Sequence, residues 1–310
     1  MIRHMNNIII VTTTINTPTK ATLEFINKGY PVIVVGDLKT PHNEYENLEN
    51  VIYLHPQYQA EHYKSLSDSI GWNTIQRRNI GFVEAYKRGY DIIASVDDDN
   101  IPYENWGKNI LVNKEIEVDL YDTSDDVFDP LSCTNNNQLW HRGYPIELVP
   151  KRNHIYMGKT KIIPMVQSDL WDGDPDIDSI CRLSHRPIVK FRNISPYTSN
   201  KLMPFNSQNT FIHRSILPYY MMLPFIGRMD DIWGAYILQR LTQCKIVFNE
   251  PTVYQERNKQ CLVTNLEKEI IGYRHTGNLL KDISNWRNYL PAETLKSYKI
   301  YVETMINKEI

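Results

Sequence analysis

The stretch Asp91-Ile-Ile-Ala-Ser-Val-Asp97-Asp98-Asp99-Asn100 places three adjacent acidic residues directly after a short apolar run. The apolar run over residues 92–96 predicts a buried strand. Adjacent carboxylates repel one another, and a divalent cation bound between them would remove that cost. Mg²⁺ and Mn²⁺ prefer oxygen ligands and commonly bind through one or two carboxylates plus substrate phosphates. The stretch therefore favours a metal–diphosphate site at Asp97 and Asp99. A solvated acidic turn that caps a helix is the alternative.

The residues before this stretch alternate between predicted strands and helices. This alternation predicts an α/β fold with a doubly wound, mostly parallel sheet flanked by helices, whose site lies at the carboxyl ends of the strands. We expect a catalytic domain over residues 1–255 and a mostly helical C-terminal extension over 256–310. The predicted strands cover 7–12, 31–36, 51–54, 91–96 and 245–248, and the predicted helices cover 17–27, capped by Thr17 and Pro18, 73–88 and 231–241.

Composition excludes several classes of protein. The chain carries 34 Lys and Arg against 36 Asp and Glu. It therefore lacks the net positive charge that would indicate a nucleic-acid partner. Its four cysteines are scattered without a Cys-x-x-Cys pair, which fits a reducing compartment. The apolar run Ile8–Val11 is too short for a signal peptide or a membrane span. We therefore expect a cytoplasmic protein without a membrane span, which reaches a membrane only through a partner.

The sequence does not match three common motifs for binding phosphate, a dinucleotide or calcium. Gly158-Lys159-Thr160 resembles the end of a phosphate-binding loop, but Asn153 stands where the first glycine of that loop is needed. The chain has no Gly-x-Gly-x-x-Gly, so we expect neither a flavin nor a nicotinamide cofactor. The acidic stretch 172–178 lacks the glycine and distal glutamate of a calcium loop and predicts an acidic surface loop or acceptor-site loop instead.

Polar residues next to the predicted strand ends can serve the same ligand as the acidic triplet. Asp37 ends the second strand, where its carboxylate can accept from a base or ribose, or simply form a turn. Arg77, Arg78 and Asn79 begin the helix that leads to the acidic strand. Arginines there can hold a diphosphate through bidentate bonds, or can lie on a solvated helix face.

Two further segments carry candidate catalytic residues. Arg142 stands in the sequence Trp-His-Arg-Gly-Tyr-Pro, where it meets a substrate or forms a plain turn. Asp230 and Asp231 stand at the start of a predicted helix. They are either catalytic carboxylates or sugar-hydroxyl acceptors, or they cap the helix and interact with its dipole.

These segments together resemble two related families. The segments VTTTINTPTKA (11–21), VVGDLKTP (34–41), RRNIGFVEAYKRG (77–89), DDDN (97–100), HRGYPIEL (141–148) and YQERN (254–258) are similar to the STELLO-type glycosyltransferases. The ordered segments HRGYP, DLWDGDPDID (169–178), FNSQNTFIHRSIL (205–217) and GRMDDIWGAYI (227–237) are similar to the reversibly glycosylated polypeptides, which are UDP-arabinopyranose mutases.

The resemblance implies a glycosyltransferase-A fold, in which an Asp-x-Asp motif holds Mn²⁺ or Mg²⁺ against the diphosphate of a nucleotide sugar. By position, Asp97–Asp99 are that motif. Arg142 matches the arginine implicated in the self-glycosylation of the mutases, and Asp230 and Asp231 match their paired acids. The side chains expected to bind the nucleotide are Thr13, Asp37, Arg77, Arg78, Asn79 and Asp98.

This chain departs from both families. The STELLO proteins carry a membrane anchor, which we do not expect here. Gln255 and Glu256 stand near the position of a tryptophan–histidine pair in the mutases. A third, late metal ligand is therefore not defined, and His213 and His275 are the candidates for it.

The sequence thus predicts a metal-dependent glycosyltransferase that uses a nucleotide-diphosphate sugar and a sugar, lipid or protein acceptor. One alternative is a non-flavin mutase that interconverts pyranose and furanose forms of the nucleotide sugar. The other is a catalytically silent nucleotide-sugar-binding protein. Independently of these alternatives, a second copy of the chain is a candidate partner. On this reading, Arg142→Ala removes activity and leaves folding and nucleotide binding intact.

Overall fold

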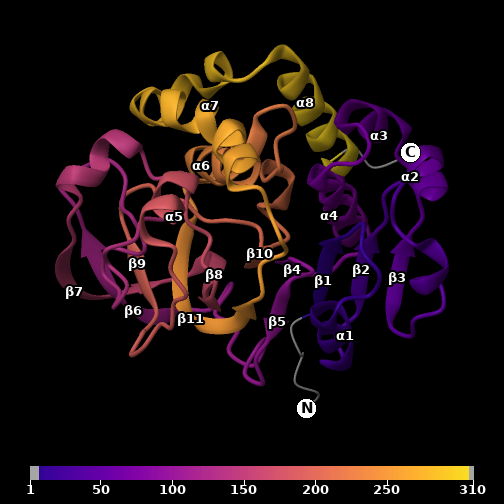
Figure 1. Ribbon diagram of the computed structural model, residues 1–310, viewed down its shortest axis with the longest axis horizontal. Coiled ribbons are helices and arrows are strands. Elements are labelled where there is room, and N and C mark those ends of the chain that lie inside the picture. Colours follow the sequence, from indigo (N-terminus) through magenta and orange to yellow (C-terminus); the bar gives the residue numbers. More distant parts are fainter. Residues whose placement is uncertain (1–6, 307–310) are drawn as a thin grey trace.

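The computed structural model describes residues 7–306, so the first six and last four residues of the two predicted domains lie outside it. An 11-stranded sheet has the order β3-β2-β1-β4-β10-β8-β11-β9-β6-β7, and β5 pairs with β11. Helices flank this sheet, and α6, α7 and α8 lie together along one side of the molecule (Figure 1). The predicted α/β architecture is confirmed, and it is consistent with the glycosyltransferase-A-like class of fold.

The elements of the structure have the following bounds. The strands are β1 (Ile8–Thr13), β2 (Val32–Val35), β3 (Val51–Leu54), β4 (Ile92–Val96), β5 (Asn100–Pro102), β6 (Ile116–Asp122), β7 (Ile155–Ile162), β8 (Pro164–Gly173), β9 (Tyr197–Ser199), β10 (Asn209–His213) and β11 (Lys245–Gln255). The α-helices are α1 (Lys20–Asn27), α2 (Pro56–His62), α3 (Lys64–Ile70), α4 (Arg78–Lys87), α5 (Ser179–His185), α6 (Asp230–Thr242), α7 (Leu262–Lys281) and α8 (Ala292–Ile306). The 3₁₀ helices are η1 (His42–Glu44), η2 (Ile75–Arg77), η3 (Ile146–Lys151), η4 (Leu217–Tyr219), η5 (Gly227–Met229) and η6 (Ile283–Tyr289).

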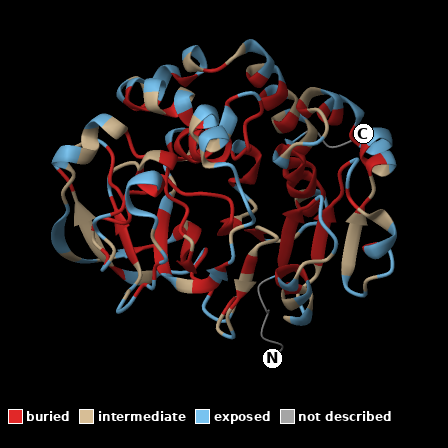
Figure 2. Ribbon diagram, viewed as in Figure 1, coloured by how far each residue is buried: buried red, intermediate tan, exposed pale blue. Residues whose placement is uncertain are grey.

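The first half of the sheet is parallel, as the alternation of strands and helices predicts. Strands β3, β2, β1 and β4 pair in parallel, and β1, β2 and β4 are buried along their whole length (Figure 2). Helix α4 packs closely onto these strands at Gly81, where an added Cβ would lie 2.5 Å from Val11 Cγ1. The carboxyl ends of these strands therefore meet at one edge of the sheet.

The second half of the sheet is mixed. Strand β10 runs antiparallel to both β4 and β8, whereas β8 and β11 are parallel. In this register Asn209 pairs with Val96, which brings the segment before β10 beside the acidic triplet. His213 pairs with Ile92 at the opposite end of β4, so the suggestion that it is a third metal ligand is wrong.

The last helices form the predicted helical C-terminal extension, and they pack onto the sheet-bearing part of the chain. In α7, Thr276 accepts a 3.0 Å hydrogen bond from the indole of Trp233 in α6. In α8, the hydroxyl of Tyr301 donates to the carbonyl of Leu217 at 3.2 Å. Among residues 7–306, no helix is both long enough and apolar enough to cross a membrane.

One local prediction differs from the structure, and another agrees with it. Helix α1 is capped by Thr19, which accepts from the backbone N–H of Thr22, and not by Thr17. Residues 158–160 lie within β7, so they form an edge strand, in agreement with the rejection of a phosphate-binding loop.

Asp169 gives the fold a pH-dependent weakness. It lies buried in β8, and burial raises its pKa to about 7. Because the folded pKa is raised, the stability associated with the neutral carboxyl is complete below pH ~4 and is lost as the pH rises towards 7. We expect Asp169→Asn to raise the free energy of unfolding by about 2 kcal/mol more at pH 8 than at pH 5. Denaturant titrations at both pH values test this, with Asp126→Asn at an exposed site as the control; equal gains at both pH values would contradict it.

Candidate active site

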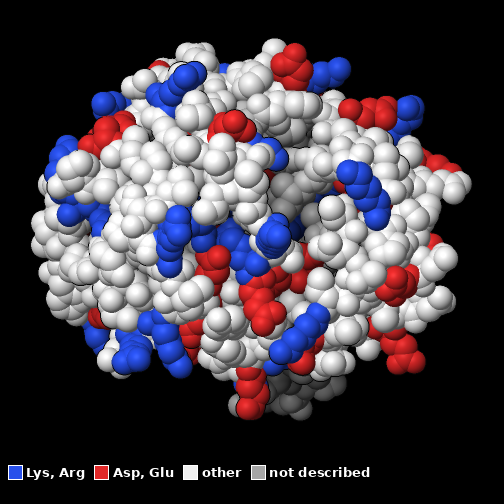
Figure 3. Space-filling view, viewed as in Figure 1, with Lys and Arg blue, Asp and Glu red and all other residues white. Residues whose placement is uncertain are grey.

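One pocket at the carboxyl edge of β1 and β4 collects most of the predicted site residues. Its volume is about 550 Å³. In the space-filling view, acidic and basic side chains gather around a hollow at the centre of the face shown (Figure 3). The charged residues that line the pocket are Arg78, Asp97, Asp98, Asp99, Arg142, Asp176, Arg228, Asp230, Asp231, Arg257 and Lys268, and Thr13 lines it as well.

The acidic triplet forms the turn between β4 and β5, and its three carboxylates face different partners. Asp97 pairs with the guanidinium of Arg78 at 2.6 Å. Asp98 accepts hydrogen bonds from Thr14 at 2.5 Å and from Asn16 at 2.9 Å. Asp99 accepts from the backbone N–H of Asn258 at 3.3 Å. Asp98 therefore holds the loop between β1 and α1, and all three carboxylates line the pocket.

Asp99 has the properties expected of a metal-binding carboxylate. Its Oδ1 atom is buried and has no hydrogen-bond partner among the described residues, and burial together with the charge of Asp97 raises its pKa. A buried, unpaired carboxylate oxygen is costly unless a cation compensates it. Within residues 7–306 no three His, Cys, Asp or Glu side chains are grouped to hold a metal. Two carboxylates completed by substrate phosphates are nevertheless a normal ligand set for Mg²⁺, so Asp97 and Asp99 fit a divalent cation of this kind.

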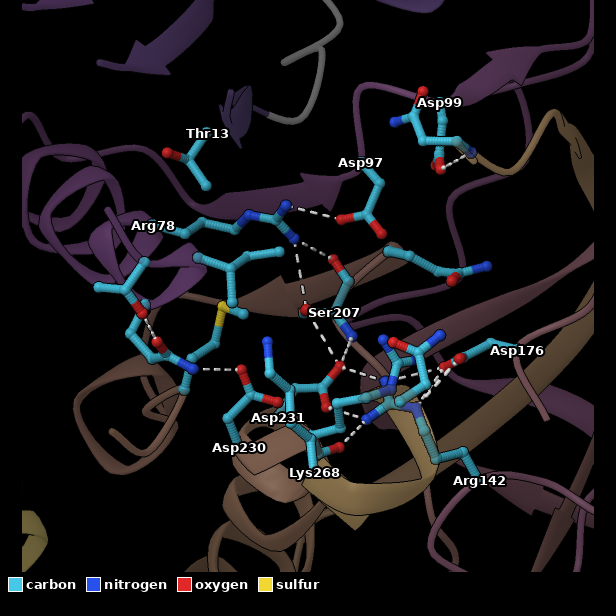
Figure 4. A pocket seen from close by; sticks show the side chains of 18 of the residues that line it. Thr13, Arg78, Asp97, Asp99, Arg142, Asp176, Ser207, Asp230, Asp231 and Lys268 are labelled. Atoms are coloured by element: carbon cyan, nitrogen blue, oxygen red, sulfur yellow. Dashed lines mark hydrogen bonds and ion pairs between the residues drawn. The ribbon is translucent and has the colours of Figure 1, made fainter. Parts of the chain in front are cut away.

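Ser207 joins the acidic triplet to a second charged cluster (Figure 4). Its carbonyl accepts from Arg78 at 3.0 Å, and its backbone N–H donates to Asp231 at 3.0 Å. Ser207 immediately precedes Gln208 and β10, so the antiparallel strand positions this link. Since Arg78 already contacts Asp97, both charged clusters share one hydrogen-bonded network.

Arg142 is the centre of the second cluster. It is buried, and its guanidinium pairs with Asp176 at 2.9 Å and with Asp231 at 2.9 Å. Burial alone would raise the pKa of Asp231, but the charge of Arg142 outweighs it and holds that pKa below its usual value. Asp231 is therefore an ionised, structurally fixed carboxylate.

Asp230 is the chemically different member of the acid pair. Its carboxylate accepts a 2.6 Å hydrogen bond from Gln76, and Met229, not an acid, stands at the N-cap of α6. Burial and the neighbouring charge of Asp231 raise the pKa of Asp230. Two adjacent carboxyls with pKa values pushed in opposite directions are the usual sign of separate acid–base roles.

The acidic stretch 172–178 was predicted to be an acidic surface loop or an acceptor-site loop, and the first of these alternatives is wrong. Asp172, Asp176 and Asp178 are all buried. Asp176 is neutralised by Arg142, 34 positions earlier in the chain, and Arg257 lies 3.8 Å from it. Asp172 accepts instead from the Tyr103 hydroxyl at 3.0 Å, and Asp178 from the Cys181 N–H at 2.8 Å. These partners compensate the acids inside the protein, and Asp176 lines the pocket.

Three predicted nucleotide-binding residues do not line the pocket. Arg77 is fully buried, donates to Ser67 Oγ at 2.9 Å and lies 3.7 Å from the ring centroid of Trp72. Asn79 is bonded to both backbone polar groups of Met222. These contacts give Arg77 and Asn79 packing roles. The prediction that either side chain binds the nucleotide is therefore wrong.

Asp37 is also used within the protein. Its carboxylate accepts from the backbone N–H groups of Leu38, Asn73 and Thr74 at 2.7–3.0 Å. Asn73 and Thr74 line the pocket. Asp37 does not line it, but it holds the backbone of these two residues in place. His275, the other suggested late metal ligand, is exposed on α7 and does not line the pocket.

Glu269 does not line the pocket, but it supports the site from behind Arg228, and sequence reasoning missed it. It is fully buried on α7 and accepts from the Ser179 N–H at 2.6 Å, the Tyr273 hydroxyl at 2.8 Å and the Arg228 Nε at 2.8 Å. The carbonyl of Arg228 in turn accepts from Arg142. Helix α7 is therefore tied to the charged cluster through Glu269. Its polar sequence gave no signal beyond a helical period.

We expect Glu269→Gln to lower the free energy of unfolding by about 1–3 kcal/mol, because an amide group would face donors that now meet a carboxylate. Turnover should fall with it, since Arg228 would no longer be fixed beside Arg142. Thermal unfolding and steady-state kinetics measure both effects. Glu267→Gln, at an exposed position on the same helix, should change neither. A Glu269→Gln protein with wild-type stability and turnover would rule out this role.

The fold and the pocket define the class of protein. An α/β sheet with an acidic turn after a central parallel strand, opposite a buried acid pair, is consistent with a glycosyltransferase-A-like protein.

Comparisons with known proteins agree with that class. The chain is 25% identical over 291 residues to the probable glycosyltransferase STELLO2 of Arabidopsis thaliana, covering 84% of this chain and 37% of that protein. It is 24% identical over 291 residues to the probable glycosyltransferase STELLO1 of the same plant, covering 84% of this chain and 36% of that protein. The resemblance to STELLO-type glycosyltransferases is thereby confirmed, although the chain spans little more than a third of either relative. No protein-family model matches the chain.

Proposed function

We propose that this protein is a metal-dependent glycosyltransferase that uses a nucleotide-diphosphate sugar as donor. The observation that carries the proposal is that one pocket holds Asp97 and Asp99 on one side and the Asp230–Asp231 pair on the other. The names of the two relatives support glycosyl transfer. The metal, the nucleotide and the residue roles are our own assignments.

The acidic triplet and Arg78 form the diphosphate end of the proposed site. Asp97 and Asp99 would hold Mn²⁺ or Mg²⁺, which would neutralise the leaving diphosphate as the glycosidic bond breaks. Arg78, already paired with Asp97 at 2.6 Å, would orient the phosphates. Thr13 ends β1 and lines the same pocket, where it would contact the nucleotide.

The acid pair forms the sugar end of the proposed site. Asp231, which Arg142 keeps ionised, would stabilise positive charge that develops at the sugar carbon. Asp230, whose pKa burial and Asp231 raise, would accept the proton of the acceptor hydroxyl. The donor glycosidic bond breaks, the bond to the acceptor oxygen forms, and the proton stays on Asp230 until water removes it.

Incubation of the protein with Mn²⁺ and a panel of UDP-, GDP-, CDP- and dTDP-sugars, with and without simple sugar acceptors, tests the proposal. Chromatography and mass spectrometry separate the outcomes. Release of nucleoside diphosphate together with a glycosylated acceptor is the expected result. A new nucleotide sugar of unchanged mass, formed without acceptor, would replace the proposal with a mutase. Nucleotide-sugar binding without any turnover would make the protein a silent binder.

A further inference from the structure

One aromatic side chain at the pocket is exposed while its neighbours are buried. Phe225 lines the pocket and has an exposed fraction of 58%. The residues around it, 220–224 and Ile226, are buried. A single exposed aromatic residue needs no explanation on a plain surface. Phe225, however, is turned outward from an otherwise buried segment at the pocket that holds the candidate catalytic acids.

The backbone around Phe225 is held in an unfavourable conformation. Phe225 has a φ of +66°, in the left-handed region that a bulky residue seldom adopts. Gly227 follows with a φ of +62°, and a Cβ there would lie 2.1 Å from the carbonyl oxygen of Lys268. Contact with α7 therefore fixes this turn. Strained residues of this kind cluster at ligand sites, where the surrounding structure holds them in place.

The C-terminal segment supplies polar side chains to the same pocket. Gln260, Asn265 and Lys268 all line it, and Asn265 donates to Gln260 at 2.6 Å. Lys268 lies on the side of Asp230 and Asp231, across from Asp97 and Asp99 (Figure 4). This region of the pocket is thus separate from the carboxylates assigned to the metal.

An exposed aromatic ring that lines the same pocket as amide and ammonium groups suits one class of ligand. The apolar face of a sugar ring packs on an aromatic side chain, and its hydroxyls need hydrogen-bonding partners at fixed positions. Phe225 and Asp230 also belong to one closed segment, because the Leu223 N–H donates to the Asp230 carbonyl at 3.1 Å. We propose that Phe225, with Asn265 and Lys268, forms the subsite for the sugar ring of a carbohydrate acceptor. This inference rests on the proposed transferase function.

Saturation-transfer NMR with simple glycosides tests the subsite without turnover. The probes are methyl β-D-glucopyranoside, methyl β-D-galactopyranoside, methyl β-D-xylopyranoside and methyl α-D-mannopyranoside, each added with UDP and with Mg²⁺, which is diamagnetic and leaves the proton signals sharp. We expect at least one glycoside to bind the wild type and Phe225→Trp. Its affinity should fall about tenfold in Phe225→Gly, the loss expected for one stacking contact.

Two controls keep the result interpretable. Phe225→Gly relieves the positive φ, so its thermal stability should equal or exceed that of the wild type, and a loss of binding would not reflect unfolding. Tyr156→Ala removes an aromatic residue that is 55% exposed on β7 and does not line the pocket, and it should leave glycoside binding unchanged.

The remaining outcomes separate this inference from the proposed function. Unchanged glycoside affinity in Phe225→Gly, or nucleotide binding with no glycoside binding in the wild type, would overturn the subsite and leave the transferase proposal standing. Glycoside binding that depends on Phe225, with no binding of any nucleotide in the panel, would support the subsite and overturn the proposed donor.

Discussion

Arg142→Ala should lower the free energy of unfolding by about 3–5 kcal/mol and abolish activity. Arg142 is 7% exposed and separates two buried carboxylates, Asp176 and Asp231. Without the guanidinium, both acids would remain buried and lose their main compensating charge. This expectation replaces the one drawn from sequence alone, in which the fold was to survive the substitution intact.

Denaturant unfolding of three variants measures this effect. Arg142→Lys keeps the charge but loses the planar guanidinium that contacts both acids, so it should fall between the wild type and alanine. Arg192→Ala removes an exposed arginine and should be neutral within about 0.5 kcal/mol. An Arg142→Ala protein as stable as Arg192→Ala would show that the buried ion cluster contributes nothing to folding.

Asp230→Asn should lower kcat by about 10²–10⁴-fold while nucleotide binding stays unchanged. The amide is nearly the same size as the carboxyl but cannot accept a proton from the acceptor hydroxyl. Gln76 can still donate to its oxygen, and the buried repulsion with Asp231 disappears, so the variant should fold. Nucleotide affinity, measured on the same preparation, serves as the internal control.

The pH profile of the wild type provides a second readout of Asp230. A base must be ionised to act, and burial with the charge of Asp231 raises the pKa of Asp230. Activity should therefore fall on the acidic side at a pH well above ~3.9, where an ordinary aspartate titrates. If Asp230→Asn kept the wild-type kcat, or if its activity fell at the same acidic pH as that of the wild type, another residue would have to be the base.

The parallel half of the fold follows from local sequence. The apolar runs at 8–13, 32–35, 51–54 and 92–96 are rich in β-branched residues and alternate with helices, so both the strands and their parallel pairing could be predicted. Register in a parallel sheet then requires that their carboxyl ends share an edge. For that reason Thr13 and Asp97–Asp99 were expected together and line one pocket.

The second charged cluster depends on contacts that local sequence does not encode. Arg142 meets Asp231, 89 positions away, and Glu269 meets Ser179, 90 positions away. Local sequence does not reveal these distant partners. The acids of the 172–178 stretch, which are buried in the structure, therefore predict a polar loop. Arg77 and Arg78 show the same limit. They are adjacent on the chain, yet one packs on Trp72 and the other faces Asp97.

Calorimetric titration of nucleoside diphosphates with and without Mn²⁺, on the wild type and on Asp99→Asn, tests the central assignment most directly. Asp126→Asn, at an exposed position outside the pocket, controls for the loss of one charge. We predict that Mn²⁺ strengthens binding of the preferred nucleotide to the wild type and to Asp126→Asn by at least about tenfold, or ~1.4 kcal/mol, and has no effect on Asp99→Asn. Equal Mn²⁺-dependent affinity in all three proteins would contradict a metal–diphosphate site at the acidic triplet.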